Sequence, residues 1–289
     1  MIILKHRQIA SFLYMLLFFV VASAARGEAA SPGLELYDKL IQGAMVRGKT
    51  DASELEVLGH TLKPDEQGRF VFGLGRDAKP SLKIKLIDAS GAALSREYAV
   101  EQRQYSVQRI DGVEKKYVEP PAEVLARIKD EAARVRQART LNRDDRAYQQ
   151  SFIWPSAGRI SGVYGSQRVF NGVPKRPHFG VDVAAPTGTA VLAPADGLVS
   201  FADADLYYSG GTLIVDHGRG ISSTFIHLSK LHVKDGDKVK QGQLLAEIGA
   251  TGRVTGPHLD WRMNWFDQRL DPALLLAPVT MGQSVGPVE

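Results

Sequence analysis

The sequence predicts a mainly β protein, with a small β-sandwich first, then one linking helix, then an all-β domain. Short runs of alternating apolar and polar residues recur between turn signals, as half-buried strands require. One stretch between the two β regions instead shows apolar residues every three or four positions, which is the period of a helix. Hydrophobic residues make up 44% and charged residues 24% of the 289 residues, as in globular proteins of about two domains.

The N-terminal segment has the pattern of a secretory signal peptide at residues 1–24. Lys5 and Arg7 precede an apolar run at 9–21, and the small residues 22–24 follow. The run is shorter than the roughly 20 residues of a transmembrane helix, so no stable membrane span is expected after cleavage. The alternative is an uncleaved membrane anchor. The chain has no cysteine, which excludes disulfides, a thiolate metal site, a cysteine nucleophile and a lipid-modified N-terminal cysteine.

Residues 33–118 are expected to form the β-sandwich. His60 is the single histidine of this region, and we expect it to be a turn or surface residue and no ligand. Turn signals such as Asp-Ala-Ser-Gly at 88–91 separate the strands. Strands are predicted at residues 54–58, 69–72, 82–87 and 105–110.

The linking segment, residues 119–150, is expected to contain one amphipathic helix at 122–141. Pro121 stands near its start, and apolar residues recur at helical spacing from Val124 to Leu141, with charged residues between them. We interpret it as a connecting helix with a solvated charged face; a partner-binding helix is the alternative.

The C-terminal region, residues 151–280, is expected to be an all-β domain because short strand patterns alternate there with glycine turns. Strands are predicted at 190–193, 197–202, 212–217, 222–227 and 244–248.

Two motifs of this region could supply metal ligands. His178 and Asp182 are separated by three residues, which would place their side chains roughly 13 Å apart on an extended strand. A shared metal therefore needs a bend, which Gly180 would permit. His258 and Asp260 are two residues apart, so on a strand they point to the same face.

A third histidine, His227, follows apolar strand residues, and on its own such a histidine is more typical of a core. We interpret His217, before a glycine turn, as structural and His232 as exposed. Together with the two motifs, His227 completes an inventory of three histidines and two aspartates. Such a set suits a catalytic metal with three protein ligands and an open water position.

The C-terminal region resembles the LytM or lysostaphin-type zinc metallopeptidases, which cut peptide bonds in bacterial peptidoglycan. The resemblance covers about residues 158–272 and implies a β-hammerhead core similar to that of biotinyl and lipoyl domains. It rests on His178-x-x-x-Asp182, Ala-Ala-Pro-Thr-Gly-Thr-Ala-Val at 184–191, Ala-Asp-Gly-Leu-Val at 195–199, Ile-His-Leu-Ser at 226–229 and Gly-Ala-Thr-Gly-Arg-Val-Thr-Gly-Pro-His-Leu at 249–259.

The resemblance implies that His178 and Asp182 bind one zinc ion and that His227 and His258 assist catalysis. The third zinc ligand of the family is a histidine, and here that position holds Asp260. A second carboxylate lowers the positive charge of the site and its power to acidify bound water, and it favours a harder metal such as manganese. Alternatively, His258 coordinates the metal and Asp260 is the base. The sequence leaves both assignments open.

The expected function is that of an exported, periplasmic zinc metallopeptidase. It would hydrolyse peptide cross-links or stem peptides of peptidoglycan by metal-activated water, with other cell-wall proteins as further partners. No nucleic-acid partner is expected, since the formal charge of +4 is not gathered in a basic block.

Two other classes of protein remain to be compared with this expectation. The first is a non-catalytic LytM-like regulator that binds and activates another cell-wall hydrolase. The second is a carrier domain, which residues 193–197 and 233–245 resemble. A carrier needs a modifiable lysine in a hairpin, and the Met-Lys-Met and Asp-Lys patterns are absent between Gly197 and Val233, which argues against it.

Overall fold

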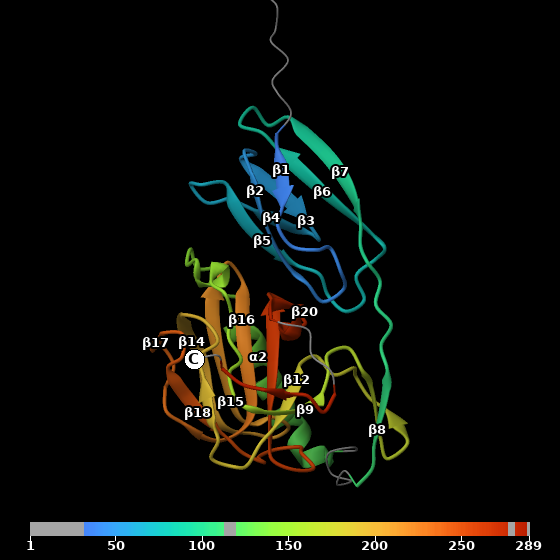
Figure 1. Ribbon diagram of the computed structural model, residues 1–289, viewed down its shortest axis with the longest axis vertical. Helices are drawn as coiled ribbons and strands as arrows, with labels where there is room; N and C mark the ends of the chain where they lie inside the picture. The colour runs from blue at the N-terminus through green and yellow to red at the C-terminus, as the bar shows by residue number, and fades with distance from the viewer. Residues whose placement is uncertain (1–31, 113–119, 277–280, 288–289) are drawn as a thin grey trace, which may run out of the picture. The chain divides into compact units, whose positions relative to one another are not determined.

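The computed structural model describes residues 32–112, 120–276 and 281–287 (Figure 1). These residues confirm the predicted fold class, since strands predominate and one α-helix is present among them. The predicted signal peptide at 1–24 lies outside the described residues. Within the described part, no helix has both the length and the apolar character needed to cross a lipid bilayer. The domain bounds predicted above stay predictions.

The N-terminal strands that are described form two antiparallel sheets, in the orders β1-β2-β5 and β4-β3-β6-β7. Their alternation is clearest on β6, where Leu82, Ile84 and Leu86 are buried while the residues between them face outward. The strands are β1 Leu34–Leu36, β2 Met45–Thr50, β3 Glu54–Val57, β4 His60–Leu62, β5 Arg69–Gly73, β6 Ser81–Ile87 and β7 Ala93–Ala99.

The strand predicted at 105–110 has a different partner from the other N-terminal strands. It forms β8, Val107–Ile110, which pairs in parallel with β10, Gln167–Phe170, and β10 pairs with β11, Val173–Pro174. A strand pattern indicates that a segment is extended but not which edge it joins. A strand that we expected in the N-terminal region therefore forms a small sheet with two strands of the C-terminal region.

The C-terminal strands form a large antiparallel sheet in the order β17-β14-β15-β16-β19-β12-β9-β21, with β13, β18 and β20 attached at its side. All nine positions of β15 are buried, so this strand lies at the centre of the fold. The strands are β9 Gly158–Gly162, β12 Val181–Ala184, β13 Ala190–Leu192, β14 Gly197–Leu206, β15 Gly210–Gly218, β16 Ile221–Leu231, β17 Lys238–Val239, β18 Leu244–Ile248, β19 His258–Trp265, β20 Gln268–Leu270 and β21 Ser284–Val285.

The predicted helix is present as α2, Leu125–Ala138, preceded by a 3-10 turn at Ala122–Val124. Val135 and Ala138 pack on a small apolar cluster of Phe201, Leu206 and Ile214. The helix thus covers part of the sheet and does more than connect two regions. The remaining 3-10 turns are Ala147–Gln149 and Pro272–Leu275.

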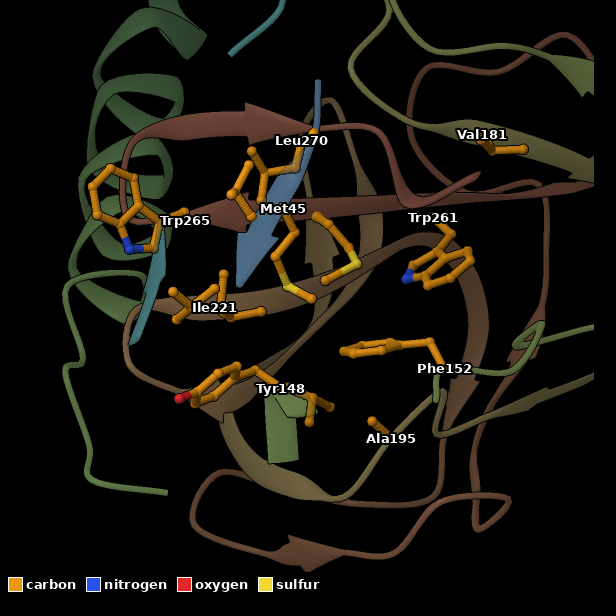
Figure 2. Packing of buried hydrophobic residues seen from close by; sticks show 14 of the residues in the cluster. Met45, Tyr148, Phe152, Val181, Ala195, Ile221, Trp261, Trp265 and Leu270 are labelled. Carbon is orange, nitrogen blue, oxygen red and sulfur yellow. The ribbon is translucent and has the colours of Figure 1, made fainter. Parts of the chain in front are cut away.

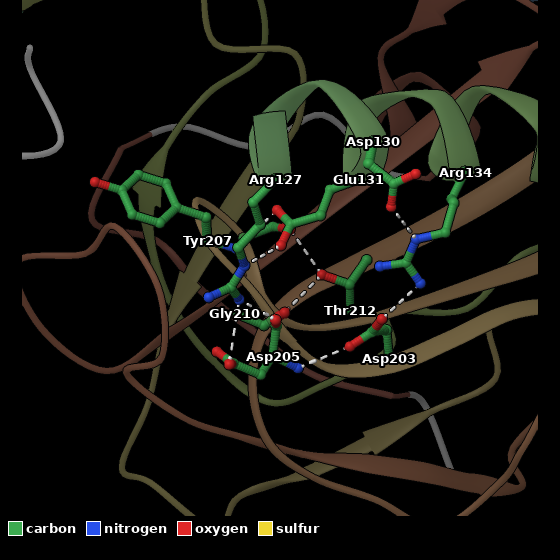
Figure 3. A network of polar contacts seen from close by, with 10 residues as sticks. Arg127, Asp130, Glu131, Arg134, Asp203, Asp205, Tyr207, Gly210 and Thr212 are labelled. Atoms are coloured by element: carbon green, nitrogen blue, oxygen red, sulfur yellow. Dashed lines mark hydrogen bonds and ion pairs between the residues drawn. The ribbon is translucent and has the colours of Figure 1, made fainter. Parts of the chain in front are cut away.

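Polar contacts fix α2 against the end of β14 (Figure 3). Glu131 is buried and accepts hydrogen bonds from the Tyr207 backbone N–H at 2.9 Å and from Arg127 Nε at 2.6 Å. Arg134 donates to Asp203 at 2.9 Å. The charged face that we expected to be solvated is therefore partly used to dock the helix.

A continuous core joins the N-terminal strands to the C-terminal sheet. Met45 from β2 and Leu270 from β20 belong to it together with Trp261 and Trp265 of β19 (Figure 2). His60, predicted as a turn or surface residue, begins β4 directly after the turn at 58–59, is half-buried, and contacts this core. Its ring stacks on Phe266, with centroids 5.0 Å apart, and lies 4.5 Å from Trp265.

The interpretation of His217 as a structural residue is confirmed. Its side chain is fully buried, and both of its ring nitrogens have hydrogen-bond partners. Nδ1 lies 2.7 Å from the Asp196 carbonyl oxygen and must donate to it, and Nε2 lies 2.9 Å from Ser223 Oγ. Burial lowers the pKa of His217 to about 4. The ring is therefore neutral at pH 7.

This burial predicts an acid-sensitive contribution to stability. The unfolded chain protonates His217 below about pH 6.5, whereas the folded protein resists protonation until about pH 4, so stability falls as pH drops through this window. We expect a loss of up to about 3 kcal/mol from this residue. Urea unfolding of His217→Gln at pH 7 and pH 4.5 should show a smaller pH dependence than wild type. The exposed His232→Gln serves as control, and equal pH dependence of all three proteins would contradict the prediction.

Candidate metal centre

Three neighbouring strands, β12, β19 and β16, position the predicted site residues. Asp182 of β12 lies directly opposite Asp260 of β19, and Asp260 also pairs with Ile226, which precedes His227. Leu259 of β19 is fully buried in the core, so His258 and Asp260 share the opposite face.

His178 lies before β12 and approaches both aspartates. Its Nε2 is 3.0 Å from Asp182 Oδ1, and its Nδ1 is 3.9 Å from Asp260 Oδ2. Gly180 is required for this approach, although its backbone does not adopt the left-handed conformation. A Cβ on Gly180 would overlap Asp260 Oδ1 and the Trp261 carbonyl oxygen. Gly180 is therefore needed because it leaves room for Asp260 and the Trp261 carbonyl group. It is not needed for a left-handed backbone conformation.

His178, Asp182 and Asp260 form a buried group, called the metal group below, and their potential ligand atoms lie within 4.8 Å of one another. The structure thus brings together the three residues predicted as metal ligands. Both ring nitrogens of His178 and Asp182 Oδ1 are buried and form no hydrogen bond of good geometry among the described residues, although Nε2 and Oδ1 lie 3.0 Å apart. Buried polar atoms without partners are costly, and one nitrogen with carboxylate oxygens suits zinc or a harder divalent cation. The residues present fit a metal.

Two arginines, which the sequence analysis did not single out, accompany the aspartates. Arg168 Nη2 donates to Asp182 Oδ2 at 2.5 Å. Arg262 donates to both oxygens of Asp260, at 2.9 and 2.6 Å. Carboxylates directly opposite on neighbouring strands repel each other, and the two guanidinium groups offset that repulsion.

The arginines also determine the charge of the two carboxyl groups. Burial opposes ionisation of Asp182, but His178 and Arg168 outweigh it and hold the pKa of Asp182 well below its usual range. Burial likewise opposes ionisation of Asp260, and the charges of Arg262 and His178 nevertheless lower its pKa to about 2. Both aspartates are ionised at neutral pH and can serve as anionic ligands.

Arg262 could have been found from the sequence, because it lies two residues after Asp260 and so shares its face of the strand. Arg168 carries no such signal. It belongs to β10, which reaches the site only through the tertiary fold.

His227 and His258 lie side by side, with ring centroids 4.9 Å apart. Nδ1 of His227 donates to the Thr251 carbonyl oxygen at 2.9 Å, and Nδ1 of His258 donates to that of Gly256 at 2.9 Å. In the neutral rings, each Nε2 therefore carries a free lone pair. Nε2 of His258 lies 3.9 Å from Asp182 Oδ1, which places it at the metal group.

The backbone of His227 is unusual for a residue with a side chain, since φ is +69°. Such a conformation carries strain and persists where the surrounding structure imposes it. Burial first, and then the charge of His258, lowers the pKa of His227 to about 4, so its ring is neutral at pH 7. A neutral ring with an exposed lone pair can accept a proton.

A small cavity of about 190 Å³ opens at these groups, with Asp182, His227 and His258 in its wall. Gln108 of β8 also lines it, so the N-terminal region contributes to the site. The structure therefore assembles two imidazoles and a carboxylate around one space. The predicted exposure of His232 is confirmed; it lies outside this cavity and pairs with Glu247 at 2.9 Å.

The region that contains these residues is similar to known proteins. Residues 176–272 match the model of peptidase family M23. A peptidoglycan DD-endopeptidase of Vibrio cholerae, ShyA, is 40% identical over 120 residues, which is 41% of this chain and 27% of that protein. A DD-carboxypeptidase/endopeptidase of Neisseria meningitidis, Mpg, is 36% identical over 103 residues, 36% of this chain and 24% of that protein. The chain thus spans about a quarter of the length of these relatives.

A solved structure extends the similarity beyond the matched region. The crystal structure of a putative peptidase M23 from Pseudomonas aeruginosa is 29% identical and superimposes with a TM-score of 0.64. The match covers 82% of this chain and 95% of that one, so the N-terminal strands share the likeness. The group of His178, Asp182 and Asp260 and the paired histidines lie within residues 176–272, the part of the chain that is similar to peptidase family M23.

Proposed function

We propose that the protein is an exported zinc metallopeptidase that hydrolyses peptide bonds of bacterial peptidoglycan in the periplasm. The observation that carries the proposal is the convergence of His178, Asp182 and Asp260 beside the imidazole rings of His227 and His258. The names of the relatives support peptidoglycan as the substrate, and other cell-wall proteins are further partners under this proposal.

In this proposal His178, Asp182 and Asp260 hold one zinc ion. Asp260 can do so while it is paired with Arg262, because a carboxylate offers about four lone-pair sites. The guanidinium groups of Arg262 and Arg168 offset the negative charge that the second carboxylate adds. The cost expected from replacing a histidine by Asp260 is therefore reduced by charges outside the ligand set.

When bound, zinc would polarise the scissile carbonyl and lower the pKa of a water molecule. The chain's own residues supply the proton transfers. His227 accepts a proton at Nε2, since its Nδ1 is held by the Thr251 carbonyl oxygen. His258, held in the same tautomer by Gly256, faces the same cavity and stabilises negative charge that develops there.

The test combines metal analysis with digestion of purified peptidoglycan by the full chain. We expect about one zinc per chain and release of soluble peptide-containing fragments, both abolished by a chelator and restored by zinc. A chain that binds no divalent metal and cuts no peptidoglycan, yet stimulates another cell-wall hydrolase, would instead support the regulator.

His227→Ala is expected to separate catalysis from metal binding. Its ring is in the cavity but outside the metal group, so zinc content should be unchanged. The rate of hydrolysis should fall by about 10²- to 10⁴-fold, the usual contribution of one general acid or base. Zinc content by mass spectrometry and fragment release measure the two effects, and a variant with full activity would remove His227 from the mechanism.

A further inference from the structure

A second, larger cavity of about 570 Å³ lies next to the metal group and is strongly basic. No aspartate or glutamate is found in its described lining. Seven of its lining side chains are cationic, namely Arg136, Arg168, Lys175, Arg176, Arg253, Arg262 and Arg269.

The cavity is assembled from segments far apart in the chain. Helix α2 provides one wall, where Ile128, Ala132 and Arg136 follow one another at i+4 spacing on a single face. The contacts of Glu131 and Arg134 with β14 hold the helix in this place (Figure 3). The helix therefore shapes a site and contributes a charge to it.

Part of the positive charge has no acidic counterpart among the described residues. Arg168 and Arg262 pair with Asp182 and Asp260, whereas Arg176 and Arg269 form no ion pair in the described part of the chain. Within the described ranges, the side chain of Arg269 donates one hydrogen bond, to the neutral side chain of Asn264 at 3.1 Å. Burial, followed by repulsion from Arg262 and Arg176, lowers the pKa of Arg269 to about 10. An anion would relieve this repulsion.

The basic cavity adjoins the cavity of His227 and His258. Arg168, Phe170 and Arg253 line both of them, and His178 lines the larger one. A group bound in the basic cavity thus lies beside the metal group, so two neighbouring parts of one substrate can occupy the two cavities.

We propose that the basic cavity binds free carboxylates of an acidic peptide whose neighbouring peptide bond lies at the metal group. The inference rests on the proposed function and adds the class of substrate that the site selects. Carboxylates suit it because guanidinium groups recognise them through paired, charge-assisted hydrogen bonds. Attraction between the unpaired arginines and the peptide would also draw the substrate to the site.

Binding can be measured without hydrolysis in the full-length His227→Ala protein, whose changed residue lies outside the basic cavity. The probe is L-alanyl-γ-D-glutamyl-L-lysyl-D-alanine with both amines acetylated, so that its two free carboxylates make it acidic, compared by calorimetry with its uncharged diamide. We expect the diamide to bind at least about tenfold more weakly, as the loss of a charge-assisted hydrogen bond implies. Binding of the acidic peptide should weaken as salt rises.

Variants identify the residues. Arg176→Gln and Arg269→Gln, added to the His227→Ala background, should each weaken binding of the acidic peptide by about tenfold and leave the diamide unaffected. Arg176 is exposed, so this variant should fold normally. Arg96→Gln is the matched control, since Arg96 lies on β7 and lines neither cavity.

Two results would overturn the proposal: equal binding of the acidic peptide and its diamide, or unchanged binding by both arginine variants. Displacement of the peptide by inorganic phosphate at equal concentration would assign the cavity to small anions and would overturn it as well. Because none of these readouts requires catalysis, a chain that binds the peptide but cuts nothing would contradict the proposed function alone.

Discussion

Replacing His178 by alanine is expected to abolish zinc retention. His178 is the centre of the metal group, within 3.0 Å of Asp182 and 3.9 Å of Asp260. Loss of residues that only support a ligand costs about 10- to 100-fold in metal affinity, so the loss of a ligand itself should cost more than about 100-fold. Hydrolysis of peptidoglycan should fall to background. Zinc per chain, measured after gel filtration, checks the prediction.

The fold should survive this substitution, because Asp182 and Asp260 keep their arginine partners. Circular dichroism and a thermal unfolding curve test that expectation. His232→Ala is the matched control, a histidine of the same region that lies on the surface and pairs with Glu247. Full zinc occupancy in His178→Ala would remove His178 from the ligand set.

Changes at Asp260 are expected to separate metal binding from stability. Asp260→Asn keeps the size of the side chain and removes its charge, so metal affinity should fall by about 10- to 100-fold. Asp260→His should retain the metal but lose stability, because Arg262 would lose its carboxylate partner. Breaking a largely buried ion pair in this way costs about 3 kcal/mol. Chelator competition and urea unfolding measure the two effects.

The double variant Asp260→His/Arg262→Met supplies the comparison for this series. It removes the unpaired charge, so it should recover most of the lost stability while it keeps the metal. If Asp260→Asn binds zinc as tightly as wild type and His258→Ala does not, the third ligand is His258, the assignment that the sequence also left open. Equal stability of Asp260→His and wild type would show that the pair with Arg262 contributes little.

The sequence was sufficient to predict several of the elements and the three residues of the metal group. The alternation in residues 82–87 and the helical period after Pro121 predicted β6 and α2, because local periodicity reports which face of an element is buried. The ordered motifs predicted His178, Asp182 and Asp260 as a group, and the fold brings them within 4.8 Å of one another. The i+2 relation of His258 and Asp260 required only that they lie on one strand.

What the sequence could not determine depends on contacts between distant segments. The predicted strand at 105–110 gave no sign that β8 would pair with β10 and place Gln108 in the cavity of His227 and His258. His60 was expected at a turn or surface, and no local pattern indicated that its ring would stack on Phe266. Partners at this range are chosen by packing and by the shape of the whole sheet, which no local pattern encodes.

The same division holds for the chemistry of the site. The resemblance seen in the sequence implied that Asp260 stands at the third ligand position, and we therefore expected a site with a second carboxylate. Only the tertiary structure decided what compensates for that charge. Arg168 arrives from β10 and pairs with Asp182, while Arg262, on the same face of β19 as Asp260, turns its guanidinium onto that carboxylate. Electrostatic energy depends on distance in space, so charges far apart in sequence set the properties of this metal group together.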